Sequence, residues 1–323
     1  MTKNNQVLVT GGAGFIGSYL VEALLAAGDA VVVIDDLSTG TLANLAAVRD
    51  HERLTFLAHR VSECPDLAEL VRHSKFVFHL AAAVGVELVL ANPLQAIRTN
   101  LHETEAILAA AATANTPLLL TSTSEVYGKS GKPVLTESDD LIIGPPHLSR
   151  WSYACSKLMD EFLALAHARN SGLPVMVARL FNTVGPRQSA RHGMVLPRFV
   201  AAALAGEPLR VHGDGSQSRC FCHVADTVQA LLRLQNLESA RGEVFNVGSP
   251  AETTILNLAT LVTRTLSSPS PIVLVPYAAA YVPGFEDMQR RCPDISKLTA
   301  ATGFQPGRSL VEIIRDTAAS LGK

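Results

Sequence analysis

A tyrosine and a lysine four residues apart, Tyr153 and Lys157, could perform acid–base chemistry. On a helix, residues at this spacing share one face, so the ammonium can lie beside the phenol. A tyrosine with a pKa near 10 must lose about three units to act as a base at pH 7, which takes about 4 kcal/mol. One ammonium at about 4 Å supplies roughly that much at an effective dielectric constant of 20. The spacing therefore predicts that Lys157 makes Tyr153 a working base.

A second polar segment contains Thr123 and Glu125, directly after the apolar run 117–121. Both polar segments follow predicted strands and lie on the side of the sheet where ligands bind. Taken alone, a tyrosine–lysine pair is often structural, and Glu125 could simply cap or pair at a strand end. The two segments together predict a catalytic site.

The element that must position a ligand beside these residues begins at the apolar strand 7–10, which runs into Gly11, Gly12, Gly14 and Gly17. Closely spaced glycines allow a tight turn, bring the backbone close to phosphates and let the next helix pack on the sheet. The free N–H groups at that helix start then face a pyrophosphate. The residues predicted to hold a dinucleotide here are Gly11, Gly14, Phe15, Ile16 and Gly17.

A second strand, 30–34, ends in Asp35 and Asp36, eighteen residues after Gly17. This is the distance at which such units place the carboxylate that accepts from the ribose hydroxyls. A carboxylate repels a 2′-phosphate, and no Arg or Lys follows in 37–40 to receive one. The sequence therefore predicts NAD rather than NADP as cofactor, with Asp35 on the ribose. The alternative is a solvated acidic turn.

Strand-like runs alternate with helical patterns along the first half of the chain. The strands are expected at 7–10, 30–34, 76–80, 117–121 and 175–180, and the helices at 15–27, 41–48, 66–72, 93–113 and 152–169. This alternation predicts an α/β fold with a doubly wound parallel Rossmann sheet. We expect an NAD-binding domain over 1–180, with later contributions near 222–248, and a smaller α/β substrate-binding lobe over 181–323.

Composition excludes several classes of function. The 323 residues are 48% hydrophobic, with 27 Lys and Arg against 29 Asp and Glu, so no nucleic-acid partner is expected. No apolar run reaches the roughly 20 residues that span a bilayer, so we expect no membrane partner and a cytoplasmic location. The five cysteines are scattered, and residues 220–222 lack the spacing of paired zinc ligands, so no metal is expected.

At this point the chain resembles the extended short-chain dehydrogenase/reductase family, whose NAD-dependent members epimerise, dehydrate or decarboxylate nucleotide sugars. The matching residues are Gly11, Gly14 and Gly17, Asp35, His79 to Ala82, Asn100, Thr123, Tyr153 with Lys157, and Arg179 to Arg187. The resemblance implies that Lys157 also holds the nicotinamide ribose, that Ala81 and Asn100 belong to the cofactor site, and that Thr123 hydrogen-bonds the oxygen at sugar carbon 4.

Within the family, residues 123–125 and the segments 141–151, 217–221 and 289–294 resemble UDP-glucuronate decarboxylases, including the decarboxylating half of a bifunctional aminoarabinose-pathway enzyme. The reaction expected from this resemblance is oxidation at carbon 4, loss of carbon dioxide from the resulting β-keto acid, and reprotonation at carbon 5. Glu125 is the candidate acid, and Arg219 orients the departing carboxylate. The product is a UDP-pentose such as UDP-xylose, or the 4-ketopentose.

The resemblance also assigns the substrate contacts, to Asn182, Arg187, Arg219 and Arg291. Arg219 has an alternative as a plain phosphate clamp, since epimerases share it. Other functions left open are a nucleotide-sugar 4-epimerase, a dehydratase and a catalytically silent NAD-binding sensor. Arg60 stands where many relatives place an adenine-binding aspartate, so adenine recognition is open. Family members commonly dimerise through the helix bearing the tyrosine, and a homodimer is therefore expected.

Overall fold

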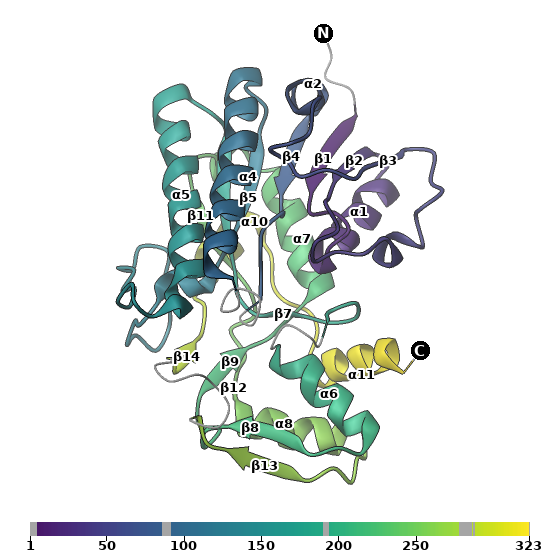
Figure 1. The fold of residues 1–323 in the computed structure, drawn as a ribbon, viewed down its shortest axis with the longest axis vertical. Coiled ribbons are helices and arrows are strands. Elements are labelled where there is room, and N and C mark those ends of the chain that lie inside the picture. Colours follow the sequence, from purple (N-terminus) through teal and green to yellow (C-terminus); the bar gives the residue numbers. More distant parts are fainter. Residues whose placement is uncertain (1–4, 86–91, 190–193, 278–285, 287, 323) are drawn as a thin grey trace.

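The structure is a computed structural model that describes residues 5–85, 92–189, 194–277, 286 and 288–322 (Figure 1). Its central sheet contains β1 (Gln6–Thr10), β2 (Ala30–Ile34), β3 (Leu54–Leu57), β4 (Phe76–His79), β5 (Leu118–Thr123), β6 (Val175–Leu180) and β11 (Val244–Val247). The strand order is β11-β6-β5-β4-β1-β2-β3, and every neighbouring pair is parallel. The predicted doubly wound fold is confirmed.

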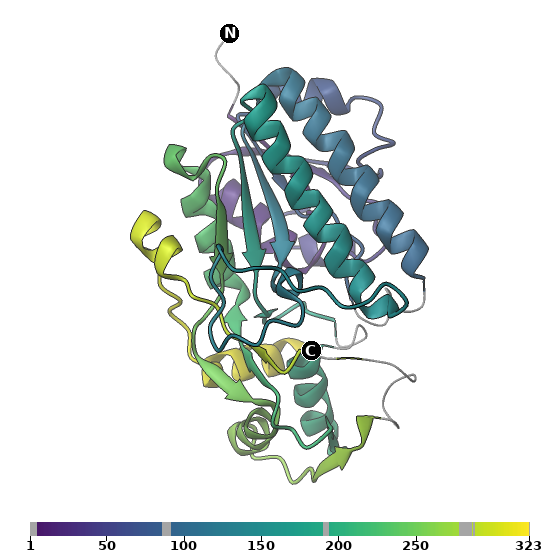
Figure 2. The same ribbon diagram turned by 90° about the vertical axis from the view of Figure 1, so that its left-hand side faces the viewer.

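Helices cover both faces of this sheet, which is why its strands are continuously apolar. One face packs on α1 (Phe15–Ala26), α7 (Val224–Gln235) and α10 (Ser296–Thr302); the other packs on α2 (Leu67–His73), α4 (Pro93–Ala114) and α5 (Ser152–Ser171) (Figure 2). Successive residues of β1 show the alternation, since Val7 and Val9 belong to the first core and Leu8 to the second.

The remaining elements form the smaller lobe below the sheet in Figure 1. A separate apolar core joins α6 (Val195–Ala205), β8 (Leu209–His212), α8 (Ile255–Thr265), β13 (Ile272–Val275) and α11 (Leu310–Leu321). The small sheet β12 (Glu252–Thr254), β9 (Ser218–Cys220) and β14 (Arg290–Arg291), and the pair β7 (Thr183–Val184) and β10 (Cys222–His223), lie between this core and the large sheet.

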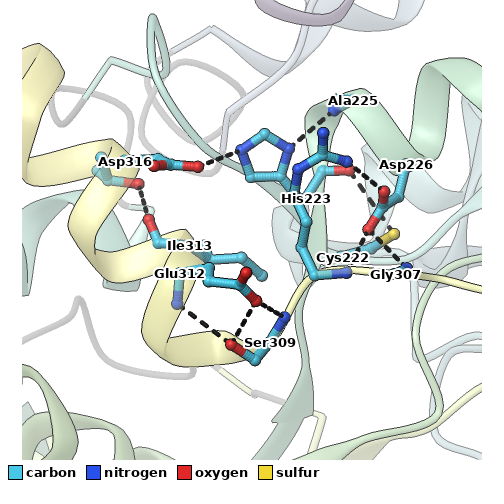
Figure 3. Close-up of polar contacts among 11 residues, drawn as sticks. Cys222, His223, Ala225, Asp226, Gly307, Ser309, Glu312, Ile313 and Asp316 are labelled. Atoms are coloured by element: carbon cyan, nitrogen blue, oxygen red, sulfur yellow. Dashed lines mark hydrogen bonds and ion pairs between the residues drawn. The ribbon is translucent and has the colours of Figure 1, made fainter.

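Polar contacts connect the start of α7 to the chain around α11 (Figure 3). His223 caps α7 by accepting from the Ala225 N–H at 3.0 Å, and its Nε2 lies 3.5 Å from a carboxylate oxygen of Asp316 on α11. Asp226 accepts from the backbone N–H groups of Gly307 and Arg308, at 3.1 and 3.0 Å. A helix that packs on the sheet is thereby tied to a helix of the lobe.

Candidate active site

A cavity of about 1120 Å³ opens at the carboxyl ends of the sheet strands. Its wall comes from the turn after β1, the ends of β2 and β5, the first turns of α5, and β9 and β14 of the lobe. Ligands of doubly wound sheets bind at this edge, where the strand order reverses. The cavity therefore brings most of the predicted cofactor and substrate residues around one space.

The glycine-rich turn at one end of the cavity leaves no room for side chains. A Cβ on Gly17 would lie 2.1 Å from the Gly11 carbonyl oxygen, and one on Gly11, whose φ is +72°, would lie 2.7 Å from the Ala81 nitrogen. Helix α1 begins at Phe15 with no side-chain cap, so its first N–H groups face the cavity. This end therefore fits a pyrophosphate.

Asp35 supports that turn as well as lining the cavity. Its two carboxylate oxygens accept from the Ala13 N–H at 2.9 Å and the Leu37 N–H at 2.8 Å. Burial raises its pKa and outweighs these two hydrogen bonds, which lower it. Each oxygen keeps a lone pair for a ribose hydroxyl, so the geometry is compatible with the predicted role. Arg60 lies nearby on the cavity wall, 3.5 Å from Asp36.

Asn100, which the resemblance assigns to the cofactor site, makes both of its side-chain hydrogen bonds within the protein. Its side chain accepts from the Ala83 N–H at 2.8 Å and donates to the Ser156 hydroxyl at 2.9 Å, and it is 1% exposed. The Ser156 hydroxyl in turn donates to the Tyr153 carbonyl. Both ends of the amide are thus used within the protein, and Asn100 holds α5 against the loop that bears Ala81 and Ala83, outside the residues that line the cavity.

Thr123 and Tyr153 come together at the centre of the cavity. Thr123 ends β5, accepts from the Glu125 N–H at 3.2 Å, and hydrogen-bonds with the Tyr153 phenol. Burial raises the Tyr153 pKa most, the Glu125 and Asp160 carboxylates raise it further, and Thr123 lowers it. Tyr153 is therefore a protonated phenol at neutral pH in this structure.

Lys157, which the sequence predicts to favour the Tyr153 phenolate, has a carboxylate as its partner in this structure. Its Nζ lies 2.8 Å from an Asp160 carboxylate oxygen, one helical turn along α5, and both side chains are buried. The Lys157 charge is therefore shared with Asp160, whose carboxylate raises the Tyr153 pKa. The ion pair between Lys157 and Asp160 could have been predicted from the sequence, because residues three apart are neighbours on a helix.

Behind this pair, a buried row of polar groups contains His79, the first residue of the matched segment 79–82. Its ring nitrogens hydrogen-bond with Thr10 at 2.8 Å and Thr104 at 3.2 Å. Burial and the Lys157 charge lower the His79 pKa to about 3, so the ring is neutral. His79 therefore links β1, β4 and α4 behind the cavity.

Glu125 lies in the short helix η2 (Ser124–Tyr127) and faces three arginines. Its carboxylate is 2.5 Å from Arg150 and 3.4 Å from Arg291, and the Arg219 charge also acts on it. Burial raises its pKa, but the three guanidinium groups together hold it below the ordinary value. The predicted acid is thus a carboxylate in this structure.

Arg150 is the functional candidate that the sequence reasoning missed. It lies in η3 (Ser149–Trp151), which runs directly into the helix bearing Tyr153, and it is 5% exposed. Arg150 and Trp151 end the segment 141–151 that resembles the decarboxylases, but nothing in the sequence places Arg150 beside Glu125. Trp151 packs under the preceding loop, since a Cβ on Gly144 would lie 2.0 Å from its Nε1.

Arg219 and Arg291 reach the cavity from adjacent strands. They are direct partners in the parallel pairing of β9 and β14, so their side chains point the same way. Asn182 also lines the cavity, and its amide donates to the Cys220 carbonyl at 3.0 Å, at the end of β9. These three predicted substrate residues therefore form one wall.

Arg187 differs from the other predicted substrate residues. Its guanidinium donates to Glu22 at 2.7 Å and Ser18 at 3.1 Å and lies over the Tyr19 ring at 4.4 Å. These are all residues of α1. Although Arg187 lines the cavity, its charge is used to hold the chain after β7 against the first helix.

A metal-binding cluster and a membrane-spanning helix are both absent from the described part of the chain. No group of three or more His, Cys, Asp or Glu side chains there could hold a metal ion. Across the same residues, no helix is long and apolar enough to cross a membrane.

The turn, the acidic strand end and the tyrosine–lysine helix around one cavity define a dinucleotide-dependent enzyme of the doubly wound α/β class. The profile of the "NAD dependent epimerase/dehydratase family" matches residues 7–248, and the chain belongs to this family. Its cofactor is NAD, which fits the uncapped helix start and the glycine turn.

Similar proteins share nearly the whole chain. A UDP-N-acetyl-alpha-D-glucosaminuronate decarboxylase of Bacillus cytotoxicus is 39% identical over 315 residues, 96% of this chain and 95% of that protein. UDP-glucuronic acid decarboxylase 1 of Arabidopsis thaliana is 36% identical over 312 residues, 96% of this chain and 68% of that protein. A Bacillus cereus UDP-glucuronic acid 4-epimerase, solved with UDP-glucuronic acid and NAD, has a TM-score of 0.88 and 27% identity over 98% of this chain and 99% of that chain.

Proposed function

We propose that the protein decarboxylates a UDP-linked hexuronate through NAD-dependent oxidation at carbon 4 of the sugar. The observation that carries this proposal is the cluster of Arg150, Arg219 and Arg291 around Glu125, in the same cavity as Tyr153. A group of arginines suits a substrate that bears a carboxylate in addition to its diphosphate. Decarboxylases that are similar to this chain over nearly its whole length support the same reaction.

Tyr153 and Thr123 are the protein groups that act on the sugar in the oxidation step. Tyr153, once deprotonated, takes the proton of the 4-hydroxyl, and Thr123 donates a hydrogen bond to the same sugar oxygen. NAD, when bound, accepts a hydride and later returns it. The product of this step is a ketone β to the sugar carboxylate.

A β-keto acid loses carbon dioxide because the bonding electrons enter an enolate. Thr123 and the protonated Tyr153 stabilise the oxyanion by hydrogen bonding. Arg219 and Arg291 hold the carboxylate before it leaves, and Glu125 supplies the proton to carbon 5. Return of the hydride gives a UDP-pentose, UDP-xylose from UDP-glucuronate, and early release gives the 4-ketopentose.

We divide the cavity into a cofactor end and a substrate end. We assign NAD to residues 1–180, through the glycine turn, Asp35, Ala81 and Lys157, with β11 and α7 completing the sheet. We assign the nucleotide sugar to 181–323, through Asn182, Arg219 and Arg291. A cytoplasmic location stays a prediction from the sequence.

Two hexuronates are candidate substrates. UDP-glucuronate follows from the motif resemblance, and UDP-N-acetylglucosaminuronate follows from the 39% identical decarboxylase. Incubating the NAD-loaded protein with each, and weighing the products by mass spectrometry, tests both. We expect one of them to lose the mass of carbon dioxide, and failure of both would overturn the proposal.

The same experiment separates the alternatives. A 4-epimerase leaves the substrate mass unchanged, a dehydratase removes water, and a silent NAD-binding protein changes nothing. The Tyr153→Phe variant is the matched control, because it keeps the ring and loses the base. We expect it to lower turnover about 10²- to 10⁴-fold.

A further inference from the structure

The proposed reaction, on which this inference rests, needs a proton from Glu125. Loss of carbon dioxide replaces a C–C bond by a C–H bond, so each turnover consumes one proton at carbon 5. The residue placed to deliver it is a carboxylate, 2.5 Å from Arg150 and 3.4 Å from Arg291. A carboxylate has no proton to give, so Glu125 must acquire one before it acts.

The substrate itself brings the group that can change this state. The sugar carboxylate is bonded to carbon 5, the atom that Glu125 must reach. A donor within hydrogen-bonding reach of carbon 5, about 3 Å, therefore lies within a few ångströms of that carboxylate. Two carboxylates at such a distance cannot both stay ionised easily, and one takes up a proton.

The charged groups around Glu125 identify which residue takes the proton. Arg150 from η3, Arg219 from β9, Arg291 from β14 and Tyr153 from α5 face its carboxylate. The arginines stay charged, and Tyr153 already carries its proton because burial and Glu125 raise its pKa. Of these groups, Glu125 is thus the one that can gain a proton when the sugar carboxylate binds the same arginines.

We propose that hexuronate binding protonates Glu125, with one proton taken from solvent, and that Glu125 gives this proton to carbon 5 after carbon dioxide has left. Before cleavage the arginines contact two carboxyl groups. The sugar carboxylate is ionised, and the Glu125 carboxyl is neutral. The C–C bond then breaks, its electron pair enters the enolate, and the sugar's negative charge near the arginines disappears. Glu125 protonates carbon 5 and returns to Arg150 as a carboxylate, so proton delivery is coupled to loss of carbon dioxide.

Calorimetry on a variant that binds the sugar but turns it over much more slowly measures this proton directly. The NAD-loaded Tyr153→Phe protein is titrated at pH 7 with UDP-glucuronate, or with UDP-N-acetylglucosaminuronate if the wild type decarboxylates that sugar. Titrations in two buffers of different ionisation enthalpy give the number of protons taken up. We expect close to one for the hexuronate and none for UDP-glucose, which has the same diphosphate and no carboxylate.

The double variant Tyr153→Phe, Glu125→Gln assigns the proton. It keeps the shape of Glu125 without its charge, and we expect binding without proton uptake. Absence of uptake in Tyr153→Phe itself, or equal uptake in the double variant, would overturn the inference. Failure of the proposed function is distinguishable, because the wild-type protein would then release no carbon dioxide from either hexuronate.

Arg150 is the positioning residue in this scheme, since it holds Glu125 ionised between turnovers. In Tyr153→Phe, the further change Arg150→Gln should leave Glu125 partly protonated before the sugar binds, and proton uptake should fall. Arg150→Lys restores the charge and should restore the uptake. Equal proton uptake in the Arg150→Gln and Arg150→Lys variants would contradict this role.

Discussion

At the residue scale, the phenol of Tyr153 lies among charges of both signs. Glu125 and Asp160 raise its pKa, whereas Arg150 and the Thr123 hydrogen bond lower it. Asp160 also neutralises Lys157, the residue whose charge would otherwise favour the phenolate. The reactivity of the base is therefore set by Asp160 as much as by the lysine four residues away.

The Asp160→Asn variant tests this balance. Asparagine keeps an oxygen that accepts from Lys157 and removes the negative charge, so the Tyr153 pKa should fall. Because the deprotonated phenol is the active form, the acid limb of kcat against pH should move to lower pH. Turnover at acidic pH should then rise several-fold over the wild type. Asn170→Gln, at an exposed position of α5, is the control, and an unmoved limb in Asp160→Asn would contradict the idea.

Which parts of the site could be predicted depends on whether the partners are close in sequence. Tyr153 with Lys157, and Thr123 with Glu125, are local patterns, and the sequence placed them correctly on a helix and at a strand end. Arg150 beside Glu125 depends on the path of residues 126–149, which no local pattern determines. The contacts of Arg187 with Glu22 and Ser18 could not be predicted for the same reason, because both belong to a distant helix.

At the scale of elements, the glycine turn and α1 fit together without spare space. A methyl group on Gly17 would lie 2.1 Å from the Gly11 carbonyl oxygen, so α1 would have to move away from the turn. The N–H groups that face the cofactor would move with it.

The Gly17→Ala variant should therefore bind NAD more weakly. It should also lose about 1–3 kcal/mol of unfolding free energy, the usual cost of an overpacked contact. Calorimetric titration with NAD and urea unfolding measure the two effects. Gly131→Ala is the matched control, because a Cβ there has no atom within 4 Å, and it should change neither quantity. Unchanged NAD affinity in Gly17→Ala would remove this account of the turn.

The burial of His223 where α7 meets α11 makes stability depend on pH (Figure 3). Burial lowers the His223 pKa, Arg308 lowers it further, and Asp316 and Asp226 act in the opposite direction. The unfolded chain then binds a proton more readily than the folded one, so stability falls as pH drops below the unfolded pKa of about 6.5.

His223→Asn isolates this effect, because asparagine is a good helix cap and does not titrate. Urea unfolding at pH 7.5 and pH 5.5 should show a smaller loss of stability in the variant than in the wild type. His102→Asn, at an exposed position on α4, should behave like the wild type. An equal loss in His223→Asn and wild type would exclude His223 as the source.

Elements that are buried and periodic were predictable, and those at edges were less so. The first and last residues predicted for the strands agree with those of β1, β2, β4, β5 and β6 within three residues. The predicted helix over 41–48 is wrong: only the short helix η1 (Leu42–Leu45) forms, with Leu45 its one buried residue. Strand β3 was absent from the predicted runs because it is short and its Thr55 is exposed at the sheet edge.

At the scale of the whole molecule, α5 carries an exposed apolar stripe beside the active site. Phe162 is 58% exposed and Met159 is 50% exposed, although both lie on the helix that bears Tyr153. Helix α4 packs beside it and leaves Leu94 57% exposed. Exposed apolar patches of this kind mark protein interfaces, and we propose that a second copy of the chain covers this one.

Phe162→Glu should convert the proposed dimer into a monomer. A charge at the centre of an apolar interface costs far more than one on an exposed surface. Size-exclusion chromatography with light scattering measures the mass of each form. Leu204→Glu, at an exposed apolar position of the lobe, should leave the mass unchanged. A wild-type monomer at micromolar concentration would refute the assignment.

The pairing of β9 with β14 has a consequence for how the protein is made. Arg291 reaches the wall of the cavity from near the end of the chain, long after the glycine turn, Tyr153 and Arg219 have left the ribosome. A nascent chain stopped before β14 lacks one of the three arginines that we propose as the binding site for a hexuronate. On the proposed assignment, competence for decarboxylation does not arise before β14 has been synthesised.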